Sequence, residues 1–245
     1  KMRRNLEEIN TLLDRTWIDI EISDKELIKL NQAMDREPDK SPIDFTRRKL
    51  RRIFNNSSFE HGGRFYHGWW QEIPSAYRKY IIISGKRIEE EDFSGIHIRM
   101  LYAFEGIELG SEDTYLIEGY GTKYRKQVKV ALNTIINAKT KKAAISSINK
   151  ELTLPKNTSA EDLFNQLKLK HPSIAKYFAT GIGIQLQYKD SKIAEKVILR
   201  LARDNIVALP IHDSFIVKMS HINDLKEEMN KAYEEVLTSE AITDK

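Results

Sequence analysis

The chain of 245 residues contains no cysteine. This absence excludes disulfides, zinc–thiolate sites and cysteine nucleophiles, and it fits a cytoplasmic location. Apolar runs are all shorter than the roughly 18 residues that a membrane-spanning helix needs, and no signal-peptide pattern is present at the start. We therefore expect no membrane partner. Internal repeats and low-complexity segments are also lacking.

The composition is that of a folded globule, with 40% hydrophobic and 31% charged residues. The net charge of +4 is small, but the basic residues form two clusters. Basic clusters with aromatic side chains between them favour a polyanion with bases that stack, although charged runs also occur on plain solvated helix faces. The clusters are Arg47, Arg48, Lys49, Arg51 and Arg52, and then Lys123, Arg125, Lys126, Lys129, Lys139, Lys141 and Lys142; the aromatic residues are Phe65, Tyr66, Trp69 and Trp70.

Hydrophobic periodicity and turn residues predict helices interrupted by two hairpins, at about 80–91 and 207–219. Residues 55–74, rich in glycine and aromatics, are expected to form a binding loop, and the prolines within 36–42 break the helical pattern before it. This order indicates an α+β fold with an antiparallel sheet backed by helices. The helices are expected near 23–34, 44–54, 94–104, 124–138, 141–150, from 159, 192–204 and 223–237.

Two aspartates stand at predicted strand ends, Asp92 before a helix and Asp213 on a tight hairpin turn. Carboxylates at such positions are rigidly aimed and open to solvent, which suits hard divalent cations. If the two meet in space, with the neighbouring carbonyl of Phe93 as a further oxygen ligand, they suit a pair of metal ions for phosphoryl or nucleotidyl transfer. Asp92 is equally well explained as a helix N-cap.

Four polar residues follow one another at intervals of four: Arg125, Lys129, Asn133 and Asn137. On a helix they form one stripe, with two cations suited to a triphosphate and two amides suited to a sugar or base. An exposed polar helix face would show the same spacing. His212, beside Asp213, is either a structural turn residue or a contact for phosphate.

The order of these segments resembles the motifs of family A DNA polymerases and of the related single-subunit, phage-type RNA polymerases. The residues from Asp92 to Arg99 resemble motif A, the stripe from Arg125 to Asn137 resembles motif B, and those from Ile211 to Phe215 resemble motif C. Gly63-Arg64 and Gln71-Glu-Ile-Pro74 are similar to the elements that precede motif A in the DNA polymerase branch. The His-Asp-Ser-Phe sequence within motif C is most similar to that of the RNA polymerase branch.

The resemblance implies a role for each of these residues. Asp92 and Asp213 are the expected catalytic residues and hold two Mg²⁺ ions (or Mn²⁺) together with Phe93, and Lys129 is the third catalytic residue. The nucleoside triphosphate is expected to contact Arg125, Asn133, Asn137 and His97. The primer–template is expected to contact Arg64, Gln71 and His212.

The resemblance also implies a polymerase palm with small fingers. We expect a helical thumb-like region at 1–60, palm with motif A at 61–110, helical fingers with motif B at 111–180, and palm with motif C at 181–245. The implied function is template-directed DNA synthesis on a primer. Two alternatives stay open: a primase-like, RNA-synthesising or template-independent nucleotidyltransferase, and a catalytically silent nucleic-acid-binding module. The thumb region is short, so a partner protein is expected to supply the missing thumb or processivity function.

The chain also departs from the family pattern at four positions. His97 replaces the usual glutamate of motif A, which excludes a ribose 2′-hydroxyl in the DNA polymerases. Asn133 replaces an aromatic residue of motif B, and Asn137-Ala138 replaces a Tyr-Gly pair. These changes leave the choice between deoxynucleotides and ribonucleotides open, and they predict unusual base selection.

Overall fold

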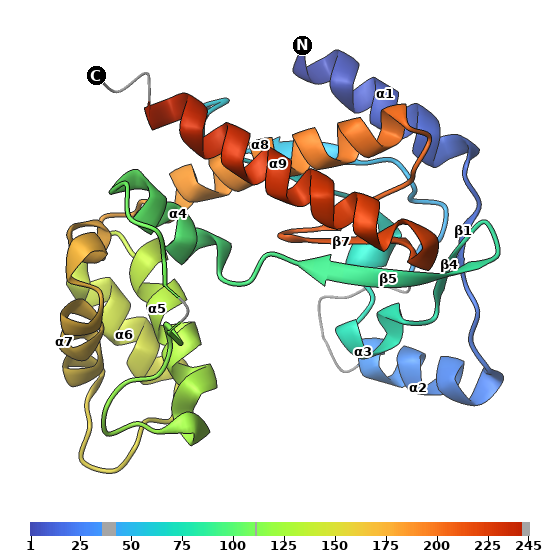
Figure 1. Ribbon diagram of the computed structural model, residues 1–245. Helices are drawn as coiled ribbons and strands as arrows, with labels where there is room; N and C mark the ends of the chain where they lie inside the picture. The colour runs from blue at the N-terminus through green and yellow to red at the C-terminus, as the bar shows by residue number, and fades with distance from the viewer. Residues whose placement is uncertain (36–42, 111, 242–245) are drawn as a thin grey trace. The chain divides into compact units, whose positions relative to one another are not determined.

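The computed structural model describes residues 1–35, 43–110 and 112–241. The predicted proline break at 36–42 lies outside this part of the chain. The described chain divides into two compact units, Lys1–Ser94 with Tyr188–Lys245, and Gly95–Gln187. Figure 1 labels the elements of both. Each unit is described by itself.

Unit 1 is a mixed unit of helices and strands, and its elements come from both ends of the chain. They are α1 (Met2–Arg15), β1 (Ile18–Ile20), α2 (Asp24–Asp35), β2 (Arg51–Phe54), β3 (Gly62–Tyr66), η1 (Trp69–Gln71), α3 (Ser75–Arg78), β4 (Ile81–Ile83), β5 (Lys86–Asp92), most of α8 (Gly183–Arg203), β6 (Leu209–Ile211), β7 (Ser214–Lys218), η4 (Met219–His221) and α9 (Ile222–Ala241).

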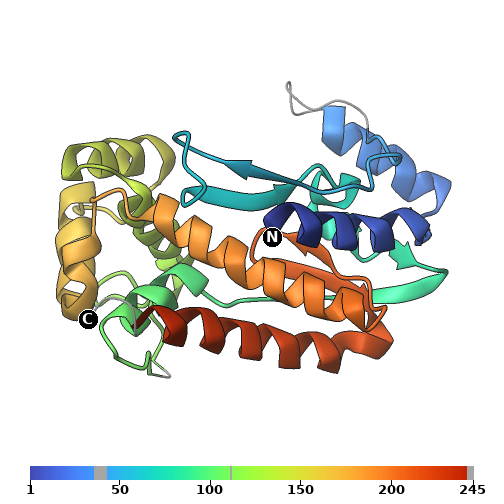
Figure 2. The same cartoon turned by 90° about the horizontal axis from the view of Figure 1, so that it is seen from above.

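Five of these strands form one antiparallel sheet in the order β1-β4-β5-β7-β6. The helix α9 packs on β5 and β7. The helix α8 lies between α1 and α9 on the same side of the sheet (Figures 1 and 2). The predicted α+β class with a helix-backed antiparallel sheet is thus confirmed.

Both predicted hairpins are present in the sheet. In the first, Ile83 pairs with Lys86, so that Ser84-Gly85 form the two-residue turn, with φ of 51° and 69°. Positive φ at both positions is typical of a type I′ turn, whose twist matches that of the strands it joins. The turn therefore lies one residue earlier than the Gly85-Lys86 turn that the sequence predicts. In the second hairpin Ile211 pairs with Ser214 around His212-Asp213.

The N-terminal region differs from the prediction. Residues 44–54 were expected to be helical, but the chain is irregular up to Leu50 and then forms the strand β2. Strand β1 was also not foreseen, and it pairs with β4 at the edge of the sheet. The first 60 residues are therefore helical only in part, and the first basic cluster lies on a loop and a strand. Periodicity failed here because strands of three or four residues are shorter than the window in which a period can be recognised.

The stretch predicted to be a binding loop is also structured. It contains β3, which pairs with β2, and the short helix η1. Trp69 and Trp70 are completely buried and Phe65 is 3% exposed. These three side chains belong to the core, so the expectation that they stack on nucleic-acid bases is wrong. Tyr66 alone of the four keeps part of its surface open.

Unit 2 is helical in its described part. It contains α4 (Ile96–Phe104), η2 (Thr122–Tyr124), α5 (Arg125–Asn137), α6 (Lys141–Glu151), α7 (Ala160–Lys170), η3 (Pro172–Tyr177) and the first turn of α8. Its core comes from the buried faces of α5, α6 and α7, including Leu132, Ile148 and Leu163. The predicted start of α7 is confirmed by a capping box. In it, Ser159 Oγ accepts a hydrogen bond from the backbone N–H of Asp162, and Asp162 Oδ2 accepts one from the backbone N–H of Ser159. Within the described residues of both units, no helix is long and apolar enough to cross a membrane.

A buried histidine holds together three segments of unit 2. His171 is 2% exposed; its Nδ1 accepts a hydrogen bond from the Tyr102 hydroxyl at 2.9 Å, and its Nε2–H donates to the Thr114 carbonyl at 3.0 Å. Burial lowers the pKa of His171 below the ordinary value of 6.5. The folded protein therefore prefers the neutral ring.

The lowered pKa of His171 predicts that the protein loses stability in acid. Below about pH 6.5 the unfolded chain takes up a proton that the folded chain resists, so the free energy of unfolding falls by up to about 1.4 kcal/mol per pH unit until the folded pKa is reached. Urea titrations of wild type and His171→Gln between pH 7.5 and 5.5 measure this. We expect His171→Gln to remove that part of the pH dependence and the half-buried control His61→Gln to keep it. Equal slopes in wild type and His171→Gln would contradict the prediction.

Candidate functional site

The two predicted metal-binding aspartates lie at the same end of neighbouring strands. Asp92, the last residue of β5, pairs with Ser214, the first residue of β7, and Asp213 comes immediately before it. Paired residues of an antiparallel ladder lie about 5 Å apart, so the Cα atoms of Asp92 and Asp213 are within about 9 Å of each other. Asp92 is exposed and Asp213 is half-buried. The sheet register therefore brings close together the backbones of two aspartates that are 121 positions apart in the sequence.

Phe93 joins the two strand ends. Its backbone N–H donates to the carbonyl of Asp213 at 3.1 Å, and its ring packs against Phe215 and Tyr233, with ring centroids 6.4 and 6.0 Å away. The backbone around both aspartates is thus fixed by a hydrogen bond and by aromatic packing. The Phe93 carbonyl is the predicted third oxygen ligand, and it belongs to this fixed segment.

A second set of contacts holds the hairpin turn against β5. The buried Ser214 hydroxyl donates to Glu90 Oε1 at 2.6 Å, and Arg78 Nη1 donates to the same oxygen at 2.8 Å. Glu90 lies two residues before Asp92, so both side chains are on one face of β5. The turn that carries Asp213 is therefore tied to the strand that carries Asp92 by a charged hydrogen-bond network.

Ser214→Ala is expected to lower the free energy of unfolding by about 1.5 kcal/mol, because the half-buried carboxylate of Glu90 loses a charge-assisted hydrogen bond from a buried hydroxyl. Urea denaturation should show a lower midpoint with an unchanged slope. The exposed Ser220→Ala is the matched control and should leave the midpoint in place. A midpoint for Ser214→Ala equal to that of the control would show that the network adds no stability.

The donor set at this end of the sheet fits Mg²⁺ or Mn²⁺. Both are hard cations that prefer oxygen, and Mg²⁺ is bound through one or two carboxylates while water and substrate phosphates complete the shell. Among the described residues there is no cluster of three or more acidic or histidine side chains suited to a metal. A cation held by Asp92, Asp213 and the Phe93 carbonyl would need water or substrate phosphates at its remaining positions.

The predicted nucleic-acid contacts lie around the same turn. Arg64, on β3, pairs with the buried Asp190 of α8. The ring of His212 meets the edge of the Tyr66 ring at 5.8 Å. His212 keeps an exposed surface, but the protein atoms packed around its ring, followed by the nearby charge of Arg64, lower its pKa, while Asp213 and Asp190 act in the opposite direction. We therefore expect a neutral imidazole beside Asp213 at pH 7, which can donate or accept a hydrogen bond but adds no positive charge.

Gln71 has a structural role in this arrangement. Its side-chain amide donates to the carbonyls of Phe65 and Pro210 at 2.9 and 3.0 Å, and its oxygen accepts from the N–H of Gly68. Trp70 Nε1 donates to the same Pro210 carbonyl at 3.1 Å. These bonds attach η1 to the strand that precedes His212. Gln71 thus positions the segment, while its contact with nucleic acid stays a prediction.

In unit 2 the predicted polar stripe lies on one exposed face of α5. Arg125 Nε donates to Asp113 Oδ2 at 2.5 Å, and its guanidinium lies 5.1 Å from the centroid of the Tyr115 ring. Lys129 Nζ lies 5.8 Å from the same ring. Tyr115 is buried, so one aromatic ring holds both cations next to each other. Two adjacent cations suit the β- and γ-phosphates of a triphosphate.

The second half of the stripe borders a shallow groove between α5 and α6. Asn133 and Asn137 line it together with Thr134, Ser147 and Glu151, and its volume is about 520 Å³. Asn137 Nδ2 donates to the carbonyl of Asn133 at 2.8 Å. His97 lies in the first turn of α4, which begins after Gly95, and is half-buried.

The predicted site residues fall into two sets. Unit 1 brings together the two aspartates with Phe93, and beside them His212, Arg64 and Gln71. Unit 2 brings together Arg125 and Lys129, and it carries Asn133, Asn137 and His97. Four further residues have contacts that the sequence did not reveal: Glu90, Asp113, Tyr115 and Asp190. No sequence motif marks these four residues. Only the tertiary contacts show that each of them contacts a predicted site residue or the turn that carries Asp213.

No family model matches this chain, and no match is found among curated proteins.

Proposed function

We propose that the protein is a template-directed nucleotidyltransferase that extends a nucleic-acid primer, with DNA synthesis of the family A type as the first candidate. The observation that supports this most is the meeting of Asp92 and Asp213 at adjacent strand ends, next to a segment fixed by Phe93. The stripe on α5 supports it independently, since Arg125 and Lys129 form a pair of cations on one ring. Nucleic acid and nucleoside triphosphates are the implied partners, and the proposed location is the cytoplasm.

In the proposed reaction the 3′-hydroxyl of the primer loses its proton to water, and its oxygen forms a bond to the α-phosphorus of a triphosphate. Pyrophosphate leaves as the bond between the α-phosphorus and the α–β bridging oxygen breaks. Asp92, Asp213 and the Phe93 carbonyl would hold two Mg²⁺ ions, which when bound lower the pKa of the 3′-hydroxyl and neutralise charge on the phosphates. Arg125 and Lys129 neutralise the charge that develops on the leaving group, and the Lys129 ammonium can give it a proton. Arg64 and His212 contact the primer–template end.

The test is single-nucleotide incorporation on a primed template, with Mg²⁺ or Mn²⁺, in which dNTPs and NTPs are offered separately. We expect products whose sequence follows the template, lost on chelation by EDTA and regained on addition of Mg²⁺. Addition that ignores the template, or starts without a primer, would favour the primase-like or template-independent enzyme. Binding of primed DNA without any incorporation, also after addition of a candidate partner protein, would favour the silent nucleic-acid-binding module.

A further inference from the structure

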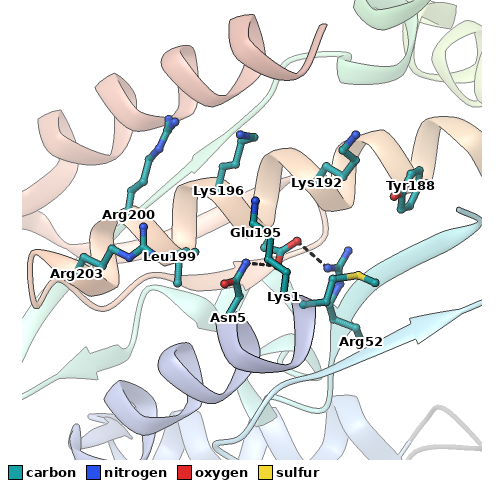
Figure 3. Close-up of a pocket in the computed structure, with 11 residues that line it drawn as sticks. Lys1, Asn5, Arg52, Tyr188, Lys192, Glu195, Lys196, Leu199, Arg200 and Arg203 are labelled. Carbon is teal, nitrogen blue, oxygen red and sulfur yellow. Dashed lines mark hydrogen bonds and ion pairs between the residues drawn. The ribbon is translucent and has the colours of Figure 1, made fainter. Parts of the chain in front are cut away.

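Two ion pairs attach the β2–β3 hairpin to α8. In the first, Arg52 Nη1 donates to Glu195 Oε2 at 2.8 Å, and Asn5 of α1 donates to the other oxygen of the same carboxylate (Figure 3). In the second, Arg64 binds one carboxylate oxygen of Asp190 through two nitrogens, with Nε at 2.8 Å. Their side-chain exposures are 5% and 14% for the first pair, and 17% and 2% for the second, arginine first.

The first pair is part of the scaffold. Arg52 also donates to the Gly63 carbonyl at 2.8 Å and to the Ser191 hydroxyl at 3.0 Å. The backbone of Gly63 comes so close to α8 that an added Cβ would lie 2.9 Å from Ser191 Oγ. The hairpin is thus already fixed on the helix by Arg52, Gly63 and Glu195. That attachment does not require the Asp190 carboxylate. Burying this carboxylate costs desolvation free energy.

The second pair differs from the first in its position. Arg64 and Tyr66 alternate with the buried Phe65 on β3, so both project from the same face of the strand. Tyr66 touches the ring of His212, which precedes Asp213. Trp70 and Gln71, which follow Tyr66 in the sequence, donate hydrogen bonds to the carbonyl of Pro210, which precedes the turn. The guanidinium held by Asp190 therefore lies on the side of β3 that faces the candidate catalytic turn.

We propose that Asp190 is a positioning residue: its buried carboxylate fixes the guanidinium of Arg64 in one orientation beside the His212–Asp213 turn, where Arg64 receives the primer end of a duplex. This inference rests on the proposed function and adds to it a residue that acts on the duplex through Arg64. A guanidinium is planar, so a carboxylate that binds two of its nitrogens sets the direction of the whole group. Without Asp190 the long side chain would regain its rotamer freedom and bind the duplex less well.

The test compares Asp190→Asn with the matched control Glu195→Gln, which disrupts the neighbouring pair on the same helix. Fluorescence anisotropy gives the Kd for a primed hairpin duplex, and incorporation assays give the KM for that duplex and for the triphosphate. We expect Asp190→Asn to raise the Kd and the KM for the duplex about tenfold, the effect of losing one well-placed charged contact. The KM for the triphosphate should stay within about twofold, and Glu195→Gln should leave all three values within the same factor.

Two further variants separate positioning from folding. Arg64→Lys keeps a charge partner for the buried Asp190 but loses the planar fork, so it should fold as wild type does and still raise the duplex Kd about tenfold. Arg64→Ala combined with Asp190→Asn should bind the duplex no more weakly than Arg64→Ala alone, because the proposal has Asp190 act on the duplex through Arg64.

Three results would overturn the proposal: additive effects of Arg64→Ala and Asp190→Asn, an equal loss of duplex affinity in Glu195→Gln, or unchanged duplex affinity in both Asp190→Asn and Arg64→Lys. Absence of incorporation by the wild type would refute the proposed function instead. The anisotropy measurements would then still decide the role of Asp190 by the same criteria.

Discussion

Asp213→Asn is expected to reduce nucleotide incorporation by at least about a thousandfold while primed-duplex binding stays within about threefold of wild type. Asparagine has nearly the same shape as aspartate, and the backbone carbonyl of residue 213 still accepts the hydrogen bond from Phe93. The substitution therefore removes a charge and leaves the turn in place. In the proposed function, binding of the duplex relies on cations and on Arg64, which the substitution does not touch.

Asp204→Asn is the matched control, since Asp204 is exposed near the end of α8 and away from the strand ends. It should incorporate nucleotides at the wild-type rate. Asp92→Asn should behave as Asp213→Asn does, because the two carboxylates are proposed to hold the same ions. Retained incorporation in either variant would reject the assignment of these aspartates as metal ligands.

Lys129→Ala is expected to lower kcat/KM for the triphosphate by about a hundredfold. The substitution removes a positive charge beside Arg125, and alanine preserves the helix α5. The neighbouring Lys126, also exposed, is not part of the stripe, so Lys126→Ala is the matched control and should change kcat/KM by less than about threefold. Steady-state incorporation with varied triphosphate measures both, and duplex affinity should be unchanged.

An unchanged KM and kcat for Lys129→Ala would contradict any role of this residue in the use of triphosphates.

The hairpins and most helices were predictable because their signals are local. The Ser84-Gly85 turn, the Ser159–Asp162 capping box and the apolar spacing of α4 and α5 all lie within a few neighbouring residues. Strand β2 was predicted as helix because its four residues have no strand signal of their own. It becomes a strand by pairing with β3 and by the contacts of Arg52 with α8, which are far away in the sequence.

The aromatic residues of the glycine-rich segment show a further limit of prediction from local sequence. Trp69 and Trp70 suggested a surface that stacks on bases, since glycine-rich segments are often loops. Burial of the two rings removes more apolar area from water than any exposed contact would, and Trp70 finds a partner for its N–H in Pro210. The sequence shows that these residues are aromatic, but only the packing decides which way they point.

From the sequence alone came the two aspartates at strand ends, the polar stripe at helical spacing and the α+β class, because each depends on spacing within one segment. The tertiary structure decided the rest. The register of β5 and β7 places Asp92 next to Asp213, the ring of Tyr115 holds Arg125 and Lys129 together, and Asp190 binds Arg64. Each of these joins segments that are distant along the chain, and such pairings depend on how buried surfaces fit, which no local pattern records.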